Sequence, residues 1–138
     1  SRLQKQYNYL KTNADVSVLG SWYQSIDEEK NIKGIRRYPV GGLTLRLYFL
    51  VRSGLAHPSV MFRKSDFKNV GEYNENLKYC EDLDLWLRYL SAGYVLNNIA
   101  EVLLKYRTKR RSFQHFKIML LVRLMNVNFR LRIKEKWK

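Results

Sequence analysis

The chain has 138 residues, 46% hydrophobic and 14% aromatic, which supports one globular domain and excludes a disordered chain. Its formal net charge is +14, but residues 1–104 carry 14 Lys and Arg against 11 Asp and Glu, whereas residues 105–138 carry 12 against 1. The basicity therefore belongs to a C-terminal tail, and this distribution argues against a chain that binds nucleic acid over its whole surface.

The single cysteine, Cys80, excludes an intramolecular disulfide and fits a reducing compartment. Acidic residues follow it and no histidine is adjacent, so a packed small residue is favoured over a nucleophile. No apolar run approaches the roughly 20 residues that span a bilayer, and the N-terminus lacks the basic-then-apolar pattern of a secretion signal. The sequence predicts neither a membrane span nor an obvious route of secretion.

The first half of the chain predicts a helix, a hairpin and a second helix. Leu3, Tyr7 and Leu10 share one face of the first helix, which Asn13 closes. The elements expected in chain order are a helix over 1–11, strands over 16–26 and 32–38 around a charged turn, and a helix over 43–51 that ends near Gly54.

The second half continues the alternation of strands and helices. The elements expected are a buried strand over 59–62, a helix entered at 63–66, a polar loop from Gly71 to Leu77, a helix from the acids at 81 and 82 to Gly93, strands over 94–98 and 102–106, and a helix from Ser112 onward. This order predicts an α/β fold in which helices flank a sheet.

The acid-headed helix is the most informative segment. Leu83, Trp86, Leu87 and Leu90 follow the i, i+3, i+4, i+7 spacing of an apolar stripe, which leaves Glu81 and Asp82 at the leading edge. A helix N-terminus stabilises a negative charge by roughly 0.3–1 kcal/mol, which favours the ionised carboxylate that a general base requires. The alternative is that these acids only cap the helix and decorate its first turn.

Other residues of this helix are expected to be structural. Asp84 and Arg88 are spaced i, i+4, which predicts a surface ion pair worth roughly 0.2–0.5 kcal/mol. Trp86 lies on the apolar stripe, so core packing is favoured over stacking against a sugar.

Five short segments together resemble family 2 glycosyltransferases of the GT-A fold. They occur in the family's order between residues 1 and about 112, and they are Gly20-Ser21-Trp22, the run from His57 to Lys64, Val70-Gly71-Glu72-Tyr73, the run from Glu81 to Arg88, and the run from Leu103 to Arg107. The resemblance implies that residues 1–108 form the acceptor-side half of such a domain, a partial GT-A sheet with flanking helices. From their charge and apolar pattern, we expect residues 109–138 to form a basic amphipathic C-terminal tail with a helix.

The resemblance also implies an activity. Such an enzyme moves a sugar from a nucleotide-sugar donor to an acceptor hydroxyl with inversion, in the synthesis of bacterial cell-surface polysaccharide or glycolipid. Asp82 matches the family's catalytic base, and Glu81 is its neighbour in the active site. A carboxylate within about 2.6–3.2 Å of the acceptor hydroxyl can take its proton as the new bond forms.

Two further residues are candidates for substrate binding. His57 precedes the expected strand over 59–62, which could place it at a sheet edge where ligands enter, or it could fix the loop ahead of Pro58. Lys109 stands where many family members have a histidine after the Tyr-Arg pair, and a protonated lysine can pair with a diphosphate but cannot coordinate a metal. His115 is a weak substitute for that histidine.

The family's Asp-x-Asp motif, which binds a divalent metal (Mg²⁺ or Mn²⁺) and the donor diphosphate, lies just before a segment like Arg2 to Gln6. The chain begins at Ser1. We therefore expect a C-terminal portion without the nucleotide-binding half and without the metal ligands, and inactive alone.

The tail suggests a partner. Lys109, Arg110 and Arg111 precede an apolar segment with further cations, which suits a helix lying on anionic lipid, where each cation contributes about 1 kcal/mol. This hypothesis places the enzyme in the cytoplasm at the inner face of the cell membrane, near lipid-linked acceptors. The alternative is that the tail packs on the absent part of the enzyme.

Two alternatives to an enzyme remain at this stage. A basic nucleic-acid-binding module would need aromatic side chains interleaved with cations on one exposed platform, whereas most aromatics here fall on core-facing positions. The other alternative is a non-catalytic interaction module.

Overall fold

A computed structural model describes residues 1–77 and 80–108 together with Leu120, Val122 and Leu124. The chain divides into two compact units, and the first contains residues 1–63 and the segment that begins at Val95. The second contains Lys64–Tyr94.

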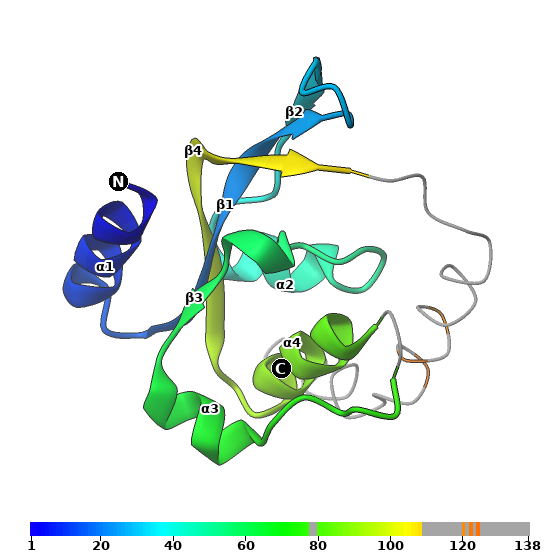
Figure 1. Cartoon of the computed structure of the whole chain (residues 1–138). Helices are drawn as coiled ribbons and strands as arrows, with labels where there is room; N and C mark the ends of the chain where they lie inside the picture. The colour runs from blue at the N-terminus through cyan, green and yellow to red at the C-terminus, as the bar shows by residue number, and fades with distance from the viewer. Residues whose placement is uncertain (78–79, 109–119, 121, 123, 125–138) are drawn as a thin grey trace. The chain divides into compact units, whose positions relative to one another are not determined.

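The first unit is built on a four-stranded mixed sheet whose central strand is β1 (Val16–Ile26). β4 (Val95–Arg107) runs parallel to β1 along its whole length, while β2 (Ile32–Arg36) and β3 (Met61–Phe62) are antiparallel to it. A strand has only two edges, so β2 and β3 share the edge of β1 that β4 leaves open. The predicted α/β class with a helix-flanked sheet is confirmed (Figure 1).

The predicted hairpin is also confirmed. Tyr23 pairs with Arg36 and Ile26 with Ile32. Asp27 accepts backbone hydrogen bonds at the turn from Glu29 at 3.1 Å and Asn31 at 2.8 Å. These local bonds explain why a charged segment closes the hairpin.

Two strand predictions were wrong in their extent. The segments over 94–98 and 102–106 form one strand. Ser21 of β1 pairs with Ile99 and the next residue, Trp22, pairs with Val102, so Ala100 and Glu101 form an irregularity within β4 and do not end it. The buried strand expected over 59–62 shrinks to the half-buried β3. A 3₁₀ turn, η1 (His57–Ser59), replaces its start.

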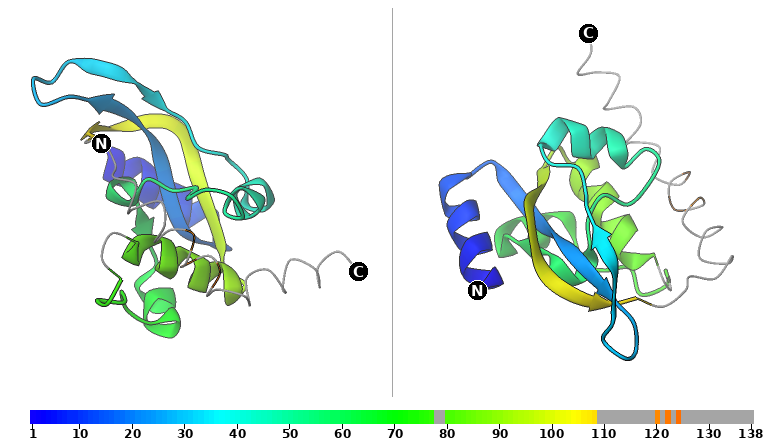
Figure 2. Two further views of the ribbon diagram at one scale, coloured as in Figure 1. Left: turned by 90° about the vertical axis from the view of Figure 1, so that its right-hand side faces the viewer. Right: turned by 90° about the horizontal axis from the view of Figure 1, so that it is seen from above.

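Helices cover both faces of this sheet (Figure 2). α1 (Arg2–Thr12) packs on one face, where Leu10, Val16 and Leu19 form a buried cluster. α2 (Gly42–Tyr48) lies on the other face, against β4. α2 ends three residues earlier than predicted.

α1 confirms its predicted ends but not its predicted buried face. Ser1 caps it and Asn13 closes it. Leu3 and Tyr7 are each 58% exposed, whereas Gln6 is fully buried and donates from Nε2 to the carbonyls of Leu19 (2.9 Å) and Ser59 (2.7 Å). Two backbone acceptors in the interior therefore make a polar residue the better core residue at this position.

The second unit contains α3 (Lys64–Val70) and α4 (Glu81–Ser91). Both helices begin where the sequence predicts. α4 buries more than the predicted stripe, since Leu85 and Tyr89 are fully buried as well. Within the described residues, no helix is both long and apolar enough to cross a membrane.

Candidate active site

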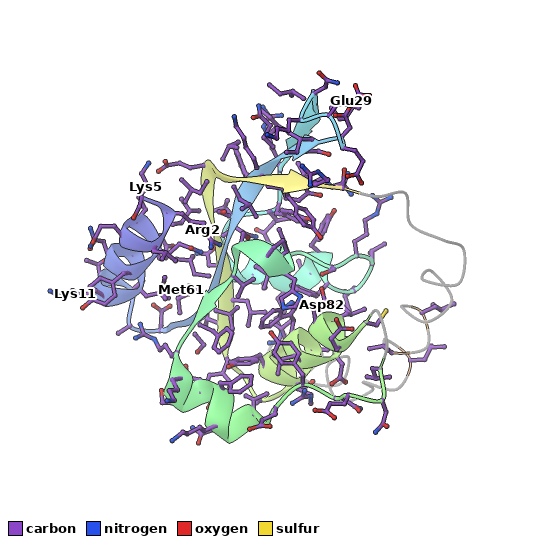
Figure 3. The ribbon with its side chains drawn as sticks, in the orientation of Figure 1. Arg2, Lys5, Lys11, Glu29, Met61 and Asp82 are labelled. Atoms are coloured by element: carbon purple, nitrogen blue, oxygen red, sulfur yellow. The ribbon has the colours of Figure 1, made fainter. Side chains whose placement is uncertain are left out.

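The acid pair begins α4, as predicted. Cys80 is the N-cap and makes no side-chain capping bond, and the first turn carries Glu81, Asp82 and Asp84. Asp82 is labelled on α4 in Figure 3. The positive end of the helix therefore carries three carboxylates, of which that of Asp84 forms an ion pair with Arg88.

The carboxylates of Glu81 and Asp82 differ in their surroundings. Asp82 is half-buried, and its Oδ1 accepts a hydrogen bond from the amide of Leu83 at 2.7 Å, so it does bond within the first turn. The Oε2 atom of Glu81 is buried and has no hydrogen-bond partner among the described residues. A buried carboxylate oxygen without a partner is unfavourable, and such atoms are expected where a ligand or proton supplies the missing bond.

The pKa of Tyr73, which lies in the second unit, is raised, and the sequence did not predict this. Burial is the main cause that raises the pKa of Tyr73, followed by the negative charges of Asp82 and Glu81. Tyr73 is the last residue of the segment Val70-Gly71-Glu72-Tyr73, one of the five that resemble the family, and this was the only feature of the sequence that could have drawn attention to it.

Arg88 has a larger role than the predicted surface ion pair. The pair with Asp84 exists at 2.8 Å, but the side chains are only 27% and 13% exposed. Arg88 also donates from Nη1 to the carbonyls of Val70 (2.9 Å) and Gly71 (3.2 Å) and from Nη2 to that of Glu72 (2.7 Å). The prediction of a weak surface pair was wrong because the i, i+4 spacing says nothing about the loop that the guanidinium also binds.

Two structural expectations are confirmed. Trp86 is fully buried, which agrees with core packing and not with stacking against a sugar. Cys80 is 1% exposed, as expected of a packed small residue.

The two predicted substrate-binding residues lie elsewhere. His57 is exposed at the start of η1 in the first unit, where its backbone carbonyl accepts from the amide of Val60 at 3.1 Å. Its membership of a site with Asp82 stays a prediction, because the two residues belong to different compact units. Lys109 lies outside the described residues, as do His115 and the predicted tail helix.

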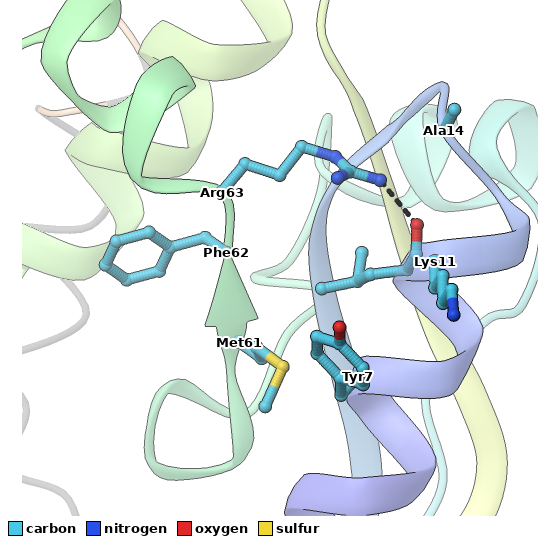
Figure 4. Close-up of a pocket in the computed structure, with 7 residues that line it drawn as sticks. Tyr7, Lys11, Ala14, Met61, Phe62 and Arg63 are labelled. Atoms are coloured by element: carbon cyan, nitrogen blue, oxygen red, sulfur yellow. Dashed lines mark hydrogen bonds between the residues drawn. The ribbon is translucent and has the colours of Figure 1, made fainter.

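The first unit has an open groove of about 440 Å³ between α1 and β3 (Figure 4). Its lining is mostly apolar and includes two cations and one phenol; the lining residues are Tyr7, Leu10, Lys11, Ala14, Met61, Phe62 and Arg63. Arg63 has a structural task, because its guanidinium donates to the carbonyls of Leu10 (2.6 Å) and Val16 (2.9 Å). No carboxylate lines the groove, so it is not the predicted catalytic site.

The described residues do not fit a metal site. In the part of the chain that the structure describes, no three His, Cys, Asp or Glu side chains come together in a way that could hold a metal ion.

Comparison with known proteins shows several relatives, and no family model matches the chain. It is 35% identical over 112 residues to an uncharacterized glycosyltransferase of Methanocaldococcus jannaschii, covering 80% of this chain and 38% of the relative. It is 30% identical over 122 residues to the amylovoran biosynthesis glycosyltransferase of Erwinia amylovora, covering 84% of this chain and 45% of the relative.

A third relative is named for its substrates. The chain is 30% identical over 112 residues to the UDP-Gal:alpha-D-GlcNAc-diphosphoundecaprenol beta-1,3-galactosyltransferase of Escherichia coli, covering 81% of this chain and 40% of that protein. The chain thus spans less than half the length of each of these three proteins.

Proposed function

Because this chain is related in sequence to glycosyltransferases over about four fifths of its length, we propose that it forms part of a family 2 glycosyltransferase of the GT-A fold. In this proposal the enzyme transfers a sugar from a nucleotide-sugar donor to an acceptor hydroxyl with inversion. The names of the relatives favour this function over a nucleic-acid-binding module.

The observation that carries the proposal is the acid pair at the start of α4. Asp82 is the proposed general base: its carboxylate accepts the proton of the acceptor hydroxyl as that oxygen bonds to the anomeric carbon and the nucleoside diphosphate leaves. The half-buried position of Asp82 supports this role, because it limits water around the carboxylate while leaving part of it accessible. Glu81 adds a second negative charge beside the developing positive charge on the sugar.

The substrates are proposed by class. The donor is a nucleotide sugar, and the acceptor is a sugar or a lipid-linked sugar. The undecaprenol in the name of the E. coli relative supports a lipid-linked acceptor. A tail that lies on anionic lipid would bring the enzyme to such a substrate.

The test uses the longest natural polypeptide that carries this sequence. Transfer is measured with UDP-galactose and a GlcNAc-diphospho-lipid, and then with a panel of other nucleotide sugars. We expect Asp82→Asn to lower kcat by about 10²–10⁴-fold while circular dichroism stays unchanged. Glu75→Gln, in the exposed loop before α4, is the matched control and should keep full turnover. A folded Asp82→Asn enzyme with unchanged turnover would remove Asp82 from the role of base.

A further inference from the structure

α2 and the turn after it are apolar on two opposite sides. Leu45 and Phe49 are fully buried, and α2 packs on β4 of the sheet. The backbone continues to coil after α2, because the amides of Val51 and Arg52 donate to the carbonyl of Tyr48 at 3.0 and 2.9 Å. Four other aliphatic side chains of this coil are exposed, and we call them the α2 apolar face: Leu43, Leu47, Leu50 and Val51.

The α2 apolar face is one continuous stripe. Its members are spaced i, i+4, i+7 and i+8, which places them on one side of the coil. At about 100° per residue, Leu47 lies nearly opposite the buried Leu45, two residues away. A helix that is apolar on all sides is normally buried, and a contiguous exposed apolar patch marks an interaction site. We therefore expect the α2 apolar face to have a partner.

The segment that contains this face carries only one sign of charge. Of the 14 Lys and Arg within residues 1–104, eight lie between residues 30 and 65, whereas none of the 11 Asp and Glu does. Arg46 and Arg52 belong to the coil itself, and Arg52 is exposed. The near balance of charge over residues 1–104 therefore hides a basic segment, and the α2 apolar face lies within it.

This charge narrows the choice of partner. A two-fold contact with a second copy would place the same basic segment against itself. The tail has the same difficulty, because residues 105–138 carry 12 Lys and Arg against one acid. The centre of a protein–protein interface is enriched in aromatic residues, whereas the α2 apolar face is wholly aliphatic. An anionic lipid surface matches both properties, since acyl chains accept aliphatic side chains and headgroups attract arginine.

We propose that the α2 apolar face docks on anionic lipid, with Leu43, Leu47 and Val51 entering the boundary between headgroups and acyl chains. Arg52 lies at the end of the same coil, where its long side chain reaches the anionic headgroups. This lipid-binding surface contains no residue of the tail and neither member of the acid pair. Its binding to lipid is therefore expected without sugar transfer and without the tail.

The first experiment measures binding to vesicles. The longest natural polypeptide that carries this sequence is sedimented with vesicles of phosphatidylserine and phosphatidylcholine, and with vesicles of phosphatidylcholine alone. Leu43→Gln should weaken binding to the anionic vesicles by about tenfold, because an aliphatic side chain no longer enters the lipid. Leu3→Gln on α1 is the matched control, since Leu3 and Leu43 are both 58% exposed, and it should bind like the unaltered protein.

The same assay tests the charge and separates this face from the tail. Arg52→Gln should weaken binding to anionic vesicles by about fivefold and leave binding to neutral vesicles unchanged. With Lys109, Arg110 and Arg111 replaced by glutamine, Leu43→Gln should still cause its tenfold loss. Equal binding by the folded Leu43→Gln and Leu3→Gln proteins would overturn the proposal. Unchanged binding by Arg52→Gln would overturn the role of Arg52.

The second experiment tests whether the face enters the bilayer. Leu47→Cys is labelled with an environment-sensitive fluorophore after any exposed cysteine outside this sequence is replaced by serine, and Cys80 is buried. We expect a blue shift with anionic vesicles, and none with neutral vesicles or with a label at Leu3→Cys. A label at position 47 that is shielded from an aqueous quencher without lipid would show that another polypeptide segment covers the face, which would overturn the proposal.

The proposed function and the lipid-binding surface can fail separately. Asp82→Asn tests the transfer of the sugar and should leave vesicle binding unchanged. Normal vesicle binding by an Asp82→Asn protein with undiminished turnover would count against Asp82 as the base and would support the lipid-binding surface. Full turnover of a water-soluble acceptor by Leu43→Gln, together with weakened vesicle binding, would support both.

Discussion

Arg88 and Asp84 lie one helical turn apart on α4, and Arg88 Nε donates to Asp84 Oδ2 at 2.8 Å. The same guanidinium closes the loop after α3 by binding three of its carbonyls. The ion pair therefore links a helix to the loop that precedes it, 16 to 18 residues away in the sequence.

Removing Arg88 should destabilise the second unit. Hydrogen bonds to a charged group contribute roughly 1.5–3 kcal/mol, and the partial exposure of Arg88 reduces their sum, so we expect Arg88→Ala to lower the free energy of unfolding by about 2–4 kcal/mol. The free energy of unfolding of Arg88→Lys should lie between those of the unaltered protein and Arg88→Ala, because an ammonium cannot reproduce the several directed N–H donors of a guanidinium. Urea unfolding measures the differences, with Lys68→Ala as the control. A loss below about 0.5 kcal/mol for Arg88→Ala would show that the hydrogen bonds of Arg88 to the loop contribute little to stability.

Gly71 should resist substitution because of its backbone angle. At φ +92° an alanine is strained by about 1–2 kcal/mol, although a Cβ there would meet Arg88 Nη1 at an ordinary 3.5 Å. We expect Gly71→Ala to destabilise by that amount and Gly71→Asn by less, since asparagine tolerates positive φ better. Thermal unfolding measures both variants. If Gly71→Ala and Gly71→Asn lose the same stability, the loss comes from steric contact and not from backbone strain.

Glu81 and Asp84 should respond oppositely to loss of charge. The buried Oε2 atom of Glu81 has no partner among the described residues, and this penalty exceeds the helix-end stabilisation of about 0.3–1 kcal/mol. Glu81→Gln should therefore raise the free energy of unfolding by about 0.5–1 kcal/mol while lowering transferase activity. Asp84→Asn should lower stability, because Asp84 anchors Arg88. Glu75→Gln is the control and should leave the stability unchanged. A destabilised Glu81→Gln protein would contradict the claim that the buried Oε2 atom of Glu81 costs stability.

Alkaline pH should weaken the first unit through Tyr38. Burial, and next the neighbouring Tyr23, raises the pKa of Tyr38 from 10.0 to about 12. Between these values the folded protein keeps a proton that the unfolded chain has released, so stability is complete below about pH 10 and is lost as pH rises toward 12, by at most about 2–3 kcal/mol. Tyr38→Phe should flatten this decline in urea unfolding followed from about pH 8 to 12. An equally steep decline in the variant would assign it to other groups.

The tail supplies a prediction that rests on sequence alone. If it lies on anionic lipid, replacing Lys109, Arg110 and Arg111 by glutamine should weaken binding to phosphatidylserine vesicles by about 100-fold, at about 1 kcal/mol per cation. Binding of the unaltered chain should fall as salt increases, and neutral vesicles serve as the control. Equal binding by the triple variant would exclude these cations as the anchor.

The sequence anticipated the features that depend on neighbours in the chain. The start of α4 at the acid pair, the ends of α1 and the hairpin turn at Asp27 follow from capping, periodicity and turn chemistry. These interactions span four residues or fewer, so they can be predicted from the local sequence.

Features that depend on distant partners could not be predicted in this way. Gln6 is buried because two interior carbonyls, those of Leu19 and Ser59, need a donor. β4 continues through Ala100 and Glu101 because β1 pairs with it on both sides of the irregularity.

For the candidate site the division is the same. The sequence alone shows that two carboxylates begin a helix with an apolar stripe, since both properties are local. The binding of the preceding loop by Arg88, and the burial that raises the pKa of Tyr73, depend on the folded chain and could not be predicted from the sequence. Side-chain spacing along a helix does not reveal which backbone carbonyls of another segment lack a donor, and these carbonyls determine where the guanidinium binds.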